Sequence, residues 1–545
     1  MKIGIDFDNT ITRYDTLFHE VAQKEGFISE KWDGSGKTEL RNHLRRQVDG
    51  EKNWMKLQGL VYGKYMHSAA MMPGFGNFLM SCKERNFQVY IVSHKTEYGH
   101  FDLEKISLRS EALKWMEERK IFDPGYFGIN REDVFFADTR EEKVNMITHL
   151  NCDWFIDDLP EVFDEKHFPV STKKILFGLY KSKQYKDRTV LNTWGKISER
   201  ILGQKTYRDI AVWAKGLLNE EIKRIEKIPG QGNSIIYRIF ANKGESYALK
   251  HYPNQLIEDR PRLEIEFQTL RILYQNGFKN IPYPIKKNID LNLGIYGWIM
   301  GKKVTQPTNN DLDQAIDFIQ TLVALPREID GQIVGNASEA CLSAHELSMQ
   351  IEKRFLRLQK VSMNFQDLSQ FLNDVFTPLW KQLKDESISL WPKESRMKDL
   401  PRNKQTLSPS DFGFHNCLKA NNGSLMFLDF EYFGWDDPVK LTADFIWHPA
   451  MNLDNELKER WKVAMTKLYS SDNCFVERLD AAMPLYGLRW ALIVLNEFLP
   501  GFAERRKFAG EADTYNILKS QETQLDKAKH YCDRVKTMIS QTIFA

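Results

Sequence analysis

The stretch KIGIDFDNT, residues Lys2–Thr10, decides the fold class of the first part of the chain. Apolar residues alternate with other residues along Lys2–Phe7, which predicts a strand. Because side chains in a strand alternate between its two faces, we expect Asp6 and Asp8 to point to the same side. An open parallel sheet binds ligands at the carboxyl ends of its strands, so two carboxylates at this end indicate a site.

The pattern around this first strand predicts an α/β fold with a doubly wound parallel sheet. Short apolar runs alternate with helical stretches up to about residue 200, as expected for parallel strands joined by helices. Residues 14–72 contain no comparable run and are rich in charged and helix-forming residues, so we expect a helical cap inserted there. The later runs that we interpret as strands are Gln88–Val92, Val134–Ala137, Trp154–Ile156 and Lys174–Phe177.

A change of pattern beyond residue 200 predicts a second domain. The chain has 545 residues, more than one hydrophobic core usually supports. Residues 201–222 read as a linker helix. A strand-rich stretch at 223–300 follows, and 301–545 is mostly helical, which predicts an α+β domain with a small sheet lobe and a helical lobe. We therefore expect domains at residues 1–200 and 223–545.

Composition favours small-molecule partners over large polyanions. The chain has 76 Lys and Arg against 74 Asp and Glu, which leaves little of the positive charge that drives nucleic-acid binding. The six cysteines form no C-x-x-C pair, and the first residues form neither a signal peptide nor a membrane span. We expect a cytoplasmic protein with no membrane and no nucleic-acid partner; nothing in the sequence indicates its oligomeric state.

The acids after the first strand suggest phosphate chemistry. One carboxylate, on Asp6, can attack phosphorus as a nucleophile, while Asp8 carries a proton to and from the leaving oxygen. Neighbouring anions repel each other, which calls for a divalent cation, and Mg²⁺ is the hard, oxygen-seeking candidate.

Later strand ends and helix starts supply the other parts of such a site. Ser93 follows a strand and offers a hydroxyl to a phosphate oxygen. Lys143 begins a helix and can neutralise the nucleophile and the phosphate. Asp157 and Asp158 end another strand and add carboxylates for a metal.

These four segments, DFDNT, IVSHKT, the single Lys143 and FIDDLP, resemble the four motifs of the haloacid-dehalogenase superfamily over about residues 1–200. The resemblance implies a phosphatase that forms a phosphoaspartate on Asp6 and uses Asp8 as acid and base. It also implies Mg²⁺ held by Asp6, by the main-chain carbonyl of Asp8 and by Asp157. The phosphate contacts that it implies come from Thr10, Ser93 and Lys143.

A second set of motifs begins with a glycine-containing loop between two strands. Its residues let main-chain N–H groups approach the phosphates of a nucleotide; they are Gly230, Gly232, Asn233 and Ser234. Lys250 lies in the next strand, YALKHY, and a helix is predicted at Pro261–Gln275. Glu264 shares the polar face of this helix, whereas Glu266 borders its apolar stripe, so Glu266 is the expected ion-pair partner of Lys250.

The third part of this set is LSPSDFGFHNCL followed by LMFLDFEYFGWDDP. Asp411 can accept the proton of a substrate hydroxyl, Asn416 can coordinate a metal, and Asp429 can hold Mg²⁺ between phosphates. A base, an amide five residues later and a carboxylate after a hairpin are the groups that phosphoryl transfer from ATP requires.

These motifs resemble the aminoglycoside phosphotransferase/choline kinase family over about residues 223–545. The resemblance implies an ATP-dependent kinase for a small-molecule hydroxyl, on a sugar or an amino alcohol. This chain has Pro409-Ser410 where relatives usually have His-Gly before the catalytic aspartate. Two interpretations follow: a bifunctional phosphatase and kinase, which we favour, or a phosphatase with a non-catalytic, nucleotide-binding regulatory domain.

Several aromatic residues near the last motif allow two further interpretations, a cage for a choline-like cation or part of the hydrophobic core. Aromatic residues next to helices are more often core, so we favour the second. The residues are Tyr432, Phe433, Trp435, Trp447 and Trp490.

Overall fold

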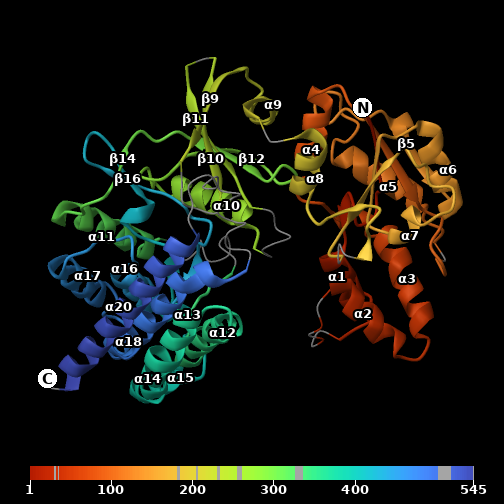
Figure 1. Ribbon diagram of the computed structural model, residues 1–545. Coiled ribbons are helices and arrows are strands. Elements are labelled where there is room, and N and C mark those ends of the chain that lie inside the picture. Colours follow the sequence, from red (N-terminus) through yellow and green to blue (C-terminus); the bar gives the residue numbers. More distant parts are fainter. Residues whose placement is uncertain are drawn as a thin grey trace.

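The structure is a computed structural model with side chains, and it has mixed α/β architecture. In Figure 1 an N-terminal and a C-terminal part lie side by side, with the small sheet of the second part and helix α9 between them. The described residues are 1–29, 32, 34, 36–102, 104–180, 184–203, 206–229, 234–242, 244–253, 260–325, 335–500 and 517–543.

A six-stranded sheet forms the centre of the N-terminal part. All its neighbouring strands pair in parallel, in the order β5-β4-β1-β6-β7-β8. The parallel sheet expected from the sequence is therefore present; its assignment to the haloacid-dehalogenase fold stays a prediction. The strands are β1 (Lys2–Ile5), β4 (Gln88–His94), β5 (Val134–Ala137), β6 (Trp154–Asp157), β7 (Lys173–Phe177) and β8 (Thr189–Leu191).

The first strand is shorter than predicted. It ends at Ile5, and the chain then turns, with the N–H of Ile11 donating to the carbonyl of Phe7 at 3.0 Å. The predicted strand Lys2–Phe7 is wrong at its end because Asp6 already leaves the ladder after one hydrogen bond, from its N–H to the Ile156 carbonyl. Both acids therefore lie in a turn at the carboxyl edge of the sheet.

Three helices fill most of the segment predicted as a cap, and Figure 1 shows them together below the sheet. The chain leaves and returns through a short antiparallel pair, Thr12–Arg13 with Ala70–Met71. Aromatic packing between the helices holds them together, because the ring of Phe18 stacks on that of Trp54 at 5.3 Å. The helices are α1 (Asp15–Lys24), α2 (Gly36–Arg45) and α3 (Gly50–Tyr62).

The other helices of the N-terminal part alternate with the strands of the parallel sheet, as the sequence pattern predicts. They are α4 (Phe75–Glu84), α5 (Leu108–Glu118), α6 (Arg140–Leu150), α7 (Pro160–Phe163) and α8 (Trp194–Leu202).

The C-terminal part begins with an antiparallel sheet, in the order β12-β13-β11-β10-β9. Helix α10 (Arg262–Gln275) follows β11 and packs against β12 and β13. The strands are β9 (Ile222–Ile228), β10 (Ile235–Ala241), β11 (Ser246–His251), β12 (Pro284–Asn288) and β13 (Leu293–Gly297).

The remainder is mainly helical, as predicted, and encloses a large apolar core. Short strands interrupt it: β14 (Lys302–Lys303), β15 (Thr406–Ser408), β16 (Cys417–Lys419), β17 (Leu425–Phe427) and β18 (Gly434–Asp436). The helices are α11 (Asn309–Val323), α12 (Ala344–Ser362), α13 (Gln366–Phe371), α14 (Thr377–Leu390), α15 (Lys393–Arg396), α16 (Pro438–Trp447), α17 (Asn455–Leu468), α18 (Phe475–Val494) and α20 (Ile517–Ile543).

Helix α9 (Tyr207–Leu218) connects the two parts, within the range predicted as a linker. A capping box between Thr206 and Asp209 starts it, and Arg85 of α4 donates to Asp209 at 2.5 Å. One cluster of buried apolar residues includes the parallel sheet, α4, α9 and the small antiparallel sheet. The two parts therefore share a core.

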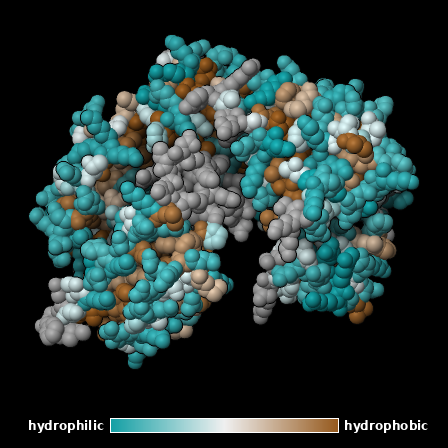
Figure 2. Space-filling view, in the orientation of Figure 1, coloured by the Kyte–Doolittle hydropathy of each residue, from teal (hydrophilic) through white to brown (hydrophobic). Residues whose placement is uncertain are grey.

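The surface carries the polar residues that the composition implies. Figure 2 shows a mainly hydrophilic face with small, scattered apolar patches. Among the described residues, no helix combines the length and apolar character needed to cross a membrane.

Candidate functional site

The first site lies where β1 and β6 end and α6 begins. The Nζ of Lys143 is 2.5 Å from Oδ1 of Asp6 and 2.6 Å from Oδ2 of Asp157, and all three side chains are buried. Thr139 caps α6, which places Lys143 in the first turn of the helix, facing the sheet. Three residues predicted from separate segments thus meet in one ion-pair cluster.

Burial and mutual repulsion perturb this cluster. Burial, and then the charges of Asp157 and Asp8, raise the pKa of Asp6 to about 7, although Lys143 acts in the opposite direction. Burial also raises the pKa of Asp158, with help from Asp6 and Asp157. Such a site disfavours several negative charges at once, so it favours a cation or a shared proton.

The carboxylate of Asp8 is held separately, by two residues on the other side of the turn. Lys95 contacts it at 2.9 Å, and the hydroxyl of Tyr14 donates to it at 2.5 Å. Lys95 is buried and lies two residues after Ser93. The sequence reasoning did not single it out, although it stands inside IVSHKT; its position at a strand end beside Ser93 was the available signal.

Two predicted phosphate contacts are buried hydroxyls. Within the described part of the chain, neither Oγ1 of Thr10 nor Oγ of Ser93 has a hydrogen-bond partner. An unsatisfied buried hydroxyl costs free energy, which a phosphate oxygen at this position would recover. Both residues therefore fit the predicted role.

The donor set also fits Mg²⁺. Carboxylate oxygens of Asp6, Asp157 and Asp158 lie within 4.8 Å of one another, and hard oxygen ligands are those that Mg²⁺ prefers. The carboxylate of Asp8 is engaged by Lys95 and Tyr14, which leaves its main-chain carbonyl as the predicted contact.

A cation from the cap faces the same site. Lys37 in α2 donates to the hydroxyl of Tyr62 at 2.8 Å and lies 4.7 Å from the ring centroid of Phe18. Burial acts to lower its pKa, but Tyr62, Asp158 and Asp8 raise it overall, so this side chain stays charged above the acids.

The second site is built around another buried lysine. The Nζ of Lys250 in β11 is 2.7 Å from Glu266 in α10, 2.7 Å from Asp429 and 3.1 Å from Glu431. Glu264 instead pairs with Lys287. The structure thus places Glu266, the predicted partner, against Lys250, because its position on α10 faces the sheet.

Glu431 is a further member that the sequence reasoning missed. It is buried, and Arg262 donates to it at 2.5 Å. Its place two residues after Asp429 was the only signal. Burial and then repulsion from Glu431 raise the pKa of Asp429 to about 7, against the effect of Lys250. Carboxylate oxygens of Asp429, Glu431 and Glu266 lie within 4.8 Å of one another, a donor set that fits Mg²⁺.

Asn416 lies at the base of the hairpin that leads to Asp429. Its carbonyl accepts from the N–H of Leu428 at 2.8 Å, next to the pair between β16 and β17. Its side-chain Nδ2 donates to the main-chain carbonyl of Asp411 at 2.9 Å. This leaves the amide oxygen as the metal ligand that the sequence predicts.

Asp411 has two histidine neighbours. The Nε2 of His415 is 3.0 Å and that of His448 is 3.7 Å from its Oδ1, and the two rings stack at 3.8 Å. Burial acts to raise the pKa of Asp411, but contacts from His415 and Asn416 hold it below its usual value. Burial lowers the pKa of His448 to about 4, so this ring is neutral at pH 7.

The unusual Pro409-Ser410 segment has its own support. Ser410 adopts a left-handed backbone with φ of 66°, a conformation that favours glycine. Its hydroxyl donates to the carbonyl of Ser338 at 3.1 Å and accepts from Lys440 of α16 at 3.0 Å. Side-chain contacts thus hold the residue that stands at the usual glycine position.

Part of the predicted nucleotide loop is not described. Gly230, Gly232 and Asn233 lie outside the described residues. Ser234 is described, and its hydroxyl donates to Glu431 at 3.4 Å, which places it beside the Lys250 cluster.

The aromatic residues near the last motif do not form one cage. Phe433 and Trp447 are buried in the core, as the favoured interpretation expects. Arg262 lies over the ring of Tyr432, and Arg402 over that of Trp435, at 4.8 and 4.6 Å.

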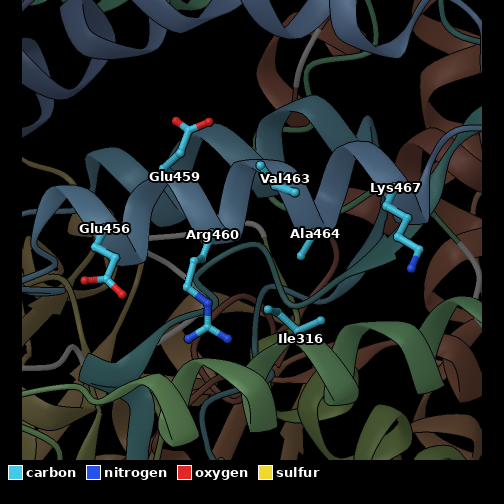
Figure 3. A pocket seen from close by; sticks show the side chains of 7 residues that line it. All are labelled: Ile316, Glu456, Glu459, Arg460, Val463, Ala464 and Lys467. Carbon is cyan, nitrogen blue, oxygen red and sulfur yellow. The ribbon is translucent and has the colours of Figure 1, made fainter.

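A surface groove of about 480 Å³ between α11 and α17 contains none of these residues. Figure 3 shows Arg460 reaching from α17 toward α11, where it pairs with Asp313 at 2.7 Å, whereas Glu459 points away from α11. Its lining residues are Ile316, Glu456, Glu459, Arg460, Val463, Ala464 and Lys467.

Comparison with known proteins finds solved structures of low sequence identity and low TM-score. No family model matches the chain, and no curated protein sequence matches it. A solved structure of spectinomycin phosphotransferase APH(9)-Ia, in complex with ADP and spectinomycin, is 16% identical and covers 58% of this chain and 98% of its own, with a TM-score of 0.40. An ethanolamine kinase of Plasmodium vivax is 14% identical over 61% of this chain and 92% of its own, with a TM-score of 0.40. The choline kinase LicA from Streptococcus pneumoniae is 15% identical and covers 60% of this chain and 99% of its own, with a TM-score of 0.39.

Proposed function

We propose that the chain is a bifunctional enzyme. Residues 1–200 hydrolyse a phosphomonoester with Mg²⁺, and residues 223–545 transfer a phosphoryl group from ATP to a hydroxyl of a small molecule. The observation that carries this proposal is the pair of buried lysine–carboxylate clusters, one around Lys143 and one around Lys250. The charge of Asp8 acts on Asp6 in the first cluster, and Asn416 connects Asp411 to Leu428, the residue before Asp429, in the second.

In the first half, a carboxylate oxygen of Asp6 attacks phosphorus and the bond from phosphorus to the ester oxygen breaks. Asp8 donates a proton to the leaving oxygen, then takes one from the water that releases phosphate from Asp6. Lys143, Ser93 and Thr10 stabilise the oxygens of the transferred group. Asp6 and Asp157 would hold Mg²⁺, which would supply positive charge to offset the repulsion between the phosphate and the acids.

In the second half, Asp411 accepts the proton of the acceptor hydroxyl, whose oxygen forms a bond to the γ-phosphorus as ADP leaves. Lys250, fixed by Glu266, positions the phosphates of ATP. Asn416 and Asp429 would hold Mg²⁺, which offsets the charge of the phosphates.

The test uses two variants of the full chain, each the control for the other. Asp6→Asn should lower Mg²⁺-dependent hydrolysis of an aryl phosphate by at least 1000-fold and leave ADP release unchanged, because only the nucleophile is removed. Asp411→Ala should do the reverse in the presence of a panel of sugars and amino alcohols. Hydrolysis that persists in Asp6→Asn would reject Asp6 as the nucleophile.

One observation favours the alternative, a non-catalytic nucleotide-binding domain. Ser410 occupies a left-handed position that favours glycine, immediately before the proposed base. ATP binding without acceptor-dependent ADP release across a broad panel would favour this alternative. The favourable contacts of Asp411 with Asn416 and His415 support catalysis instead.

A further inference from the structure

A hollow of about 510 Å³ lies beside the proposed kinase base, between the end of α16 and the C-terminal helix α20. Figure 1 shows α16 and α20 close together in the helical lobe. Among the residues that line the hollow are His448, Met451, Lys458, Lys527, His530 and Arg534.

Two of these residues connect the hollow to the catalytic loop. His448 lies 3.7 Å from Asp411 and stacks on His415, so one residue borders both the base and the hollow. The sulfur of Met451 is 3.1 Å from the main-chain N–H of Phe414, in the same loop. The side chain of Asp411 is 37% exposed, which leaves room for an acceptor hydroxyl.

The hollow is positively charged. Lys458, Lys527 and Arg534 contribute three cations against the single acid Asp526, which pairs with Lys529 at 3.3 Å. Within the described residues, no carboxylate lies at ion-pair distance from Lys458 or Arg534. Burial and the charge of Arg534 lower the pKa of Lys458, although the charge of Asp454 acts in the opposite direction.

The aromatic residues here are already covered by a cation of the protein. The guanidinium of Arg534 lies 4.3 Å from the ring centroid of Trp447 and 5.6 Å from that of Tyr531. A cationic acceptor would therefore meet repulsion from Lys458 and Arg534 and would find these ring faces occupied.

We propose that the acceptor of the kinase carries an anionic group, a carboxylate or a phosphate, which binds between Lys458, Lys527 and Arg534 while its hydroxyl faces Asp411. The proposal rests on the proposed kinase function and narrows its substrate class to hydroxyl compounds with negative charge. Lys458 and Arg534 are partly exposed and, within the described residues, have no carboxylate at ion-pair distance, so they favour an acceptor of negative charge over one of positive charge.

The experiment measures binding apart from turnover. Four compounds share a polyol chain and differ in the group at one end, a carboxylate, a phosphate, a hydroxyl or an amine: gluconate, sorbitol 6-phosphate, sorbitol and glucamine. Calorimetric titration of the full-length protein with Mg-ADP present should show at least tenfold tighter binding of gluconate or sorbitol 6-phosphate than of sorbitol, with glucamine the weakest. Comparing the affinities of gluconate and sorbitol 6-phosphate shows whether the site prefers a carboxylate or a phosphate.

Variants locate the effect. The double variant Lys458→Gln/Arg534→Gln should abolish the preference for the anion. Arg534 also packs on the ring of Trp447, whereas Lys527 is exposed, so Lys527→Gln removes charge without removing this packing and should reduce the preference severalfold. Lys536→Gln, an exposed lysine of the same helix outside the hollow, is the control and should keep it. Equal or tighter binding of sorbitol or glucamine, binding of none of the four, or a preference that survives all variants would overturn the proposal. Anion binding without Asp411-dependent ADP release would reject the kinase function and leave the anion site standing.

Discussion

Single buried lysines organise both proposed sites at the residue scale. Lys143 joins Asp6 to Asp157, and Lys250 joins Glu266 to Asp429. Each lysine compensates acids that could not otherwise remain charged inside the protein. In both clusters, however, acids outnumber the lysine, and burial together with repulsion between the acids raises the pKa of one carboxylate, Asp6 or Asp429, to about 7. This excess negative charge is what a metal ion would neutralise.

The raised pKa of Asp6 has a consequence for stability. The folded protein keeps the proton up to about pH 7, whereas the unfolded chain loses it near the usual value of 3.8, so stability falls as pH rises between these values. We expect Asp6→Asn, which cannot ionise, to stabilise the protein more at pH 8 than at pH 5, by about 2 kcal/mol.

The measurement is urea unfolding at both pH values with EDTA present, so that no divalent ion binds. The control is Asp480→Asn, because Asp480 is an exposed acid of the C-terminal part. This substitution should change the free energy of unfolding by the same small amount at pH 5 and at pH 8. A stabilisation by Asp6→Asn that does not grow between pH 5 and pH 8 would contradict the raised pKa of Asp6.

Lys95 gives a second prediction at this scale. It fixes the carboxylate of Asp8, so Lys95→Met should lower kcat for phosphate ester hydrolysis by about 10- to 100-fold, the range of a misplaced acid–base group. KM should change little because Lys95 does not belong to the predicted phosphate contacts. A rise in KM with kcat preserved would show instead that Lys95 binds the substrate.

What the sequence could predict at this scale follows from local signals. Asp6, Ser93 and Asp157 stand at ends of apolar runs, and the parallel sheet brings such ends to one edge. The remaining contacts join residues that lie far apart in the chain, and no local pattern specifies such pairs. The pairs are Lys95 with Asp8, 87 positions apart, Glu431 with Lys250, 181 apart, and Lys440 with Ser410, 30 apart.

At the scale of elements, α16 supports the loop that carries the proposed base. Lys440 of α16 is buried, and its Nζ lies 3.0 Å from Asp436, 3.4 Å from Asp444 and 3.0 Å from the hydroxyl of Ser410. The helix thereby holds Ser410 in its left-handed conformation.

Sequence periodicity predicts helices and strands of this kind well. It missed the short strand β8 and placed the end of β1 two residues late, because hydrogen bonding at strand ends depends on neighbouring strands.

Removing this lysine should affect both stability and kinase activity. Lys440→Met leaves the buried carboxylate of Asp436 without its cation, which costs about 3–5 kcal/mol, whereas Asp444 keeps Arg489 at 3.3 Å. It also frees Ser410, so ADP release with an acceptor should fall at least tenfold in kcat. Thermal unfolding and initial rates check both effects.

Lys462→Met is the matched control, because Lys462 of α17 pairs with Asp480 at the surface, where such a pair contributes about 0–1 kcal/mol. Equal stability of the Lys440 and Lys462 variants would show that the α16 cluster does not support the loop.

The two parts are joined by a buried interface at the scale of the whole molecule. Asn77 of α4 donates to the carbonyl of Leu291, just before β13, at 2.9 Å, and Trp213 of α9 packs against His251, the neighbour of Lys250, at 5.6 Å. The sequence predicts two domains with a linker helix between them. It gives no sign of a shared core, because residues far apart in the chain supply it.

A shared core predicts that the two parts unfold together. At Gly76 of α4, a Cβ atom would lie 3.0 Å from Phe127, 3.1 Å from the Leu291 side chain and 3.2 Å from the Asp290 carbonyl. Gly76→Leu should therefore force α4 away from the turn before β13, with a cost of about 1–3 kcal/mol or more. Scanning calorimetry should show one main transition for the native chain and two, with the first at lower temperature, for Gly76→Leu.

The control is Gly195→Leu on the exposed side of α8, which should keep the single transition. A Cβ atom at Gly195 would lie 3.9 Å from its nearest neighbouring atom. Two separate transitions already present in the native chain would show that the contact between α4 and β13 does not couple the two parts.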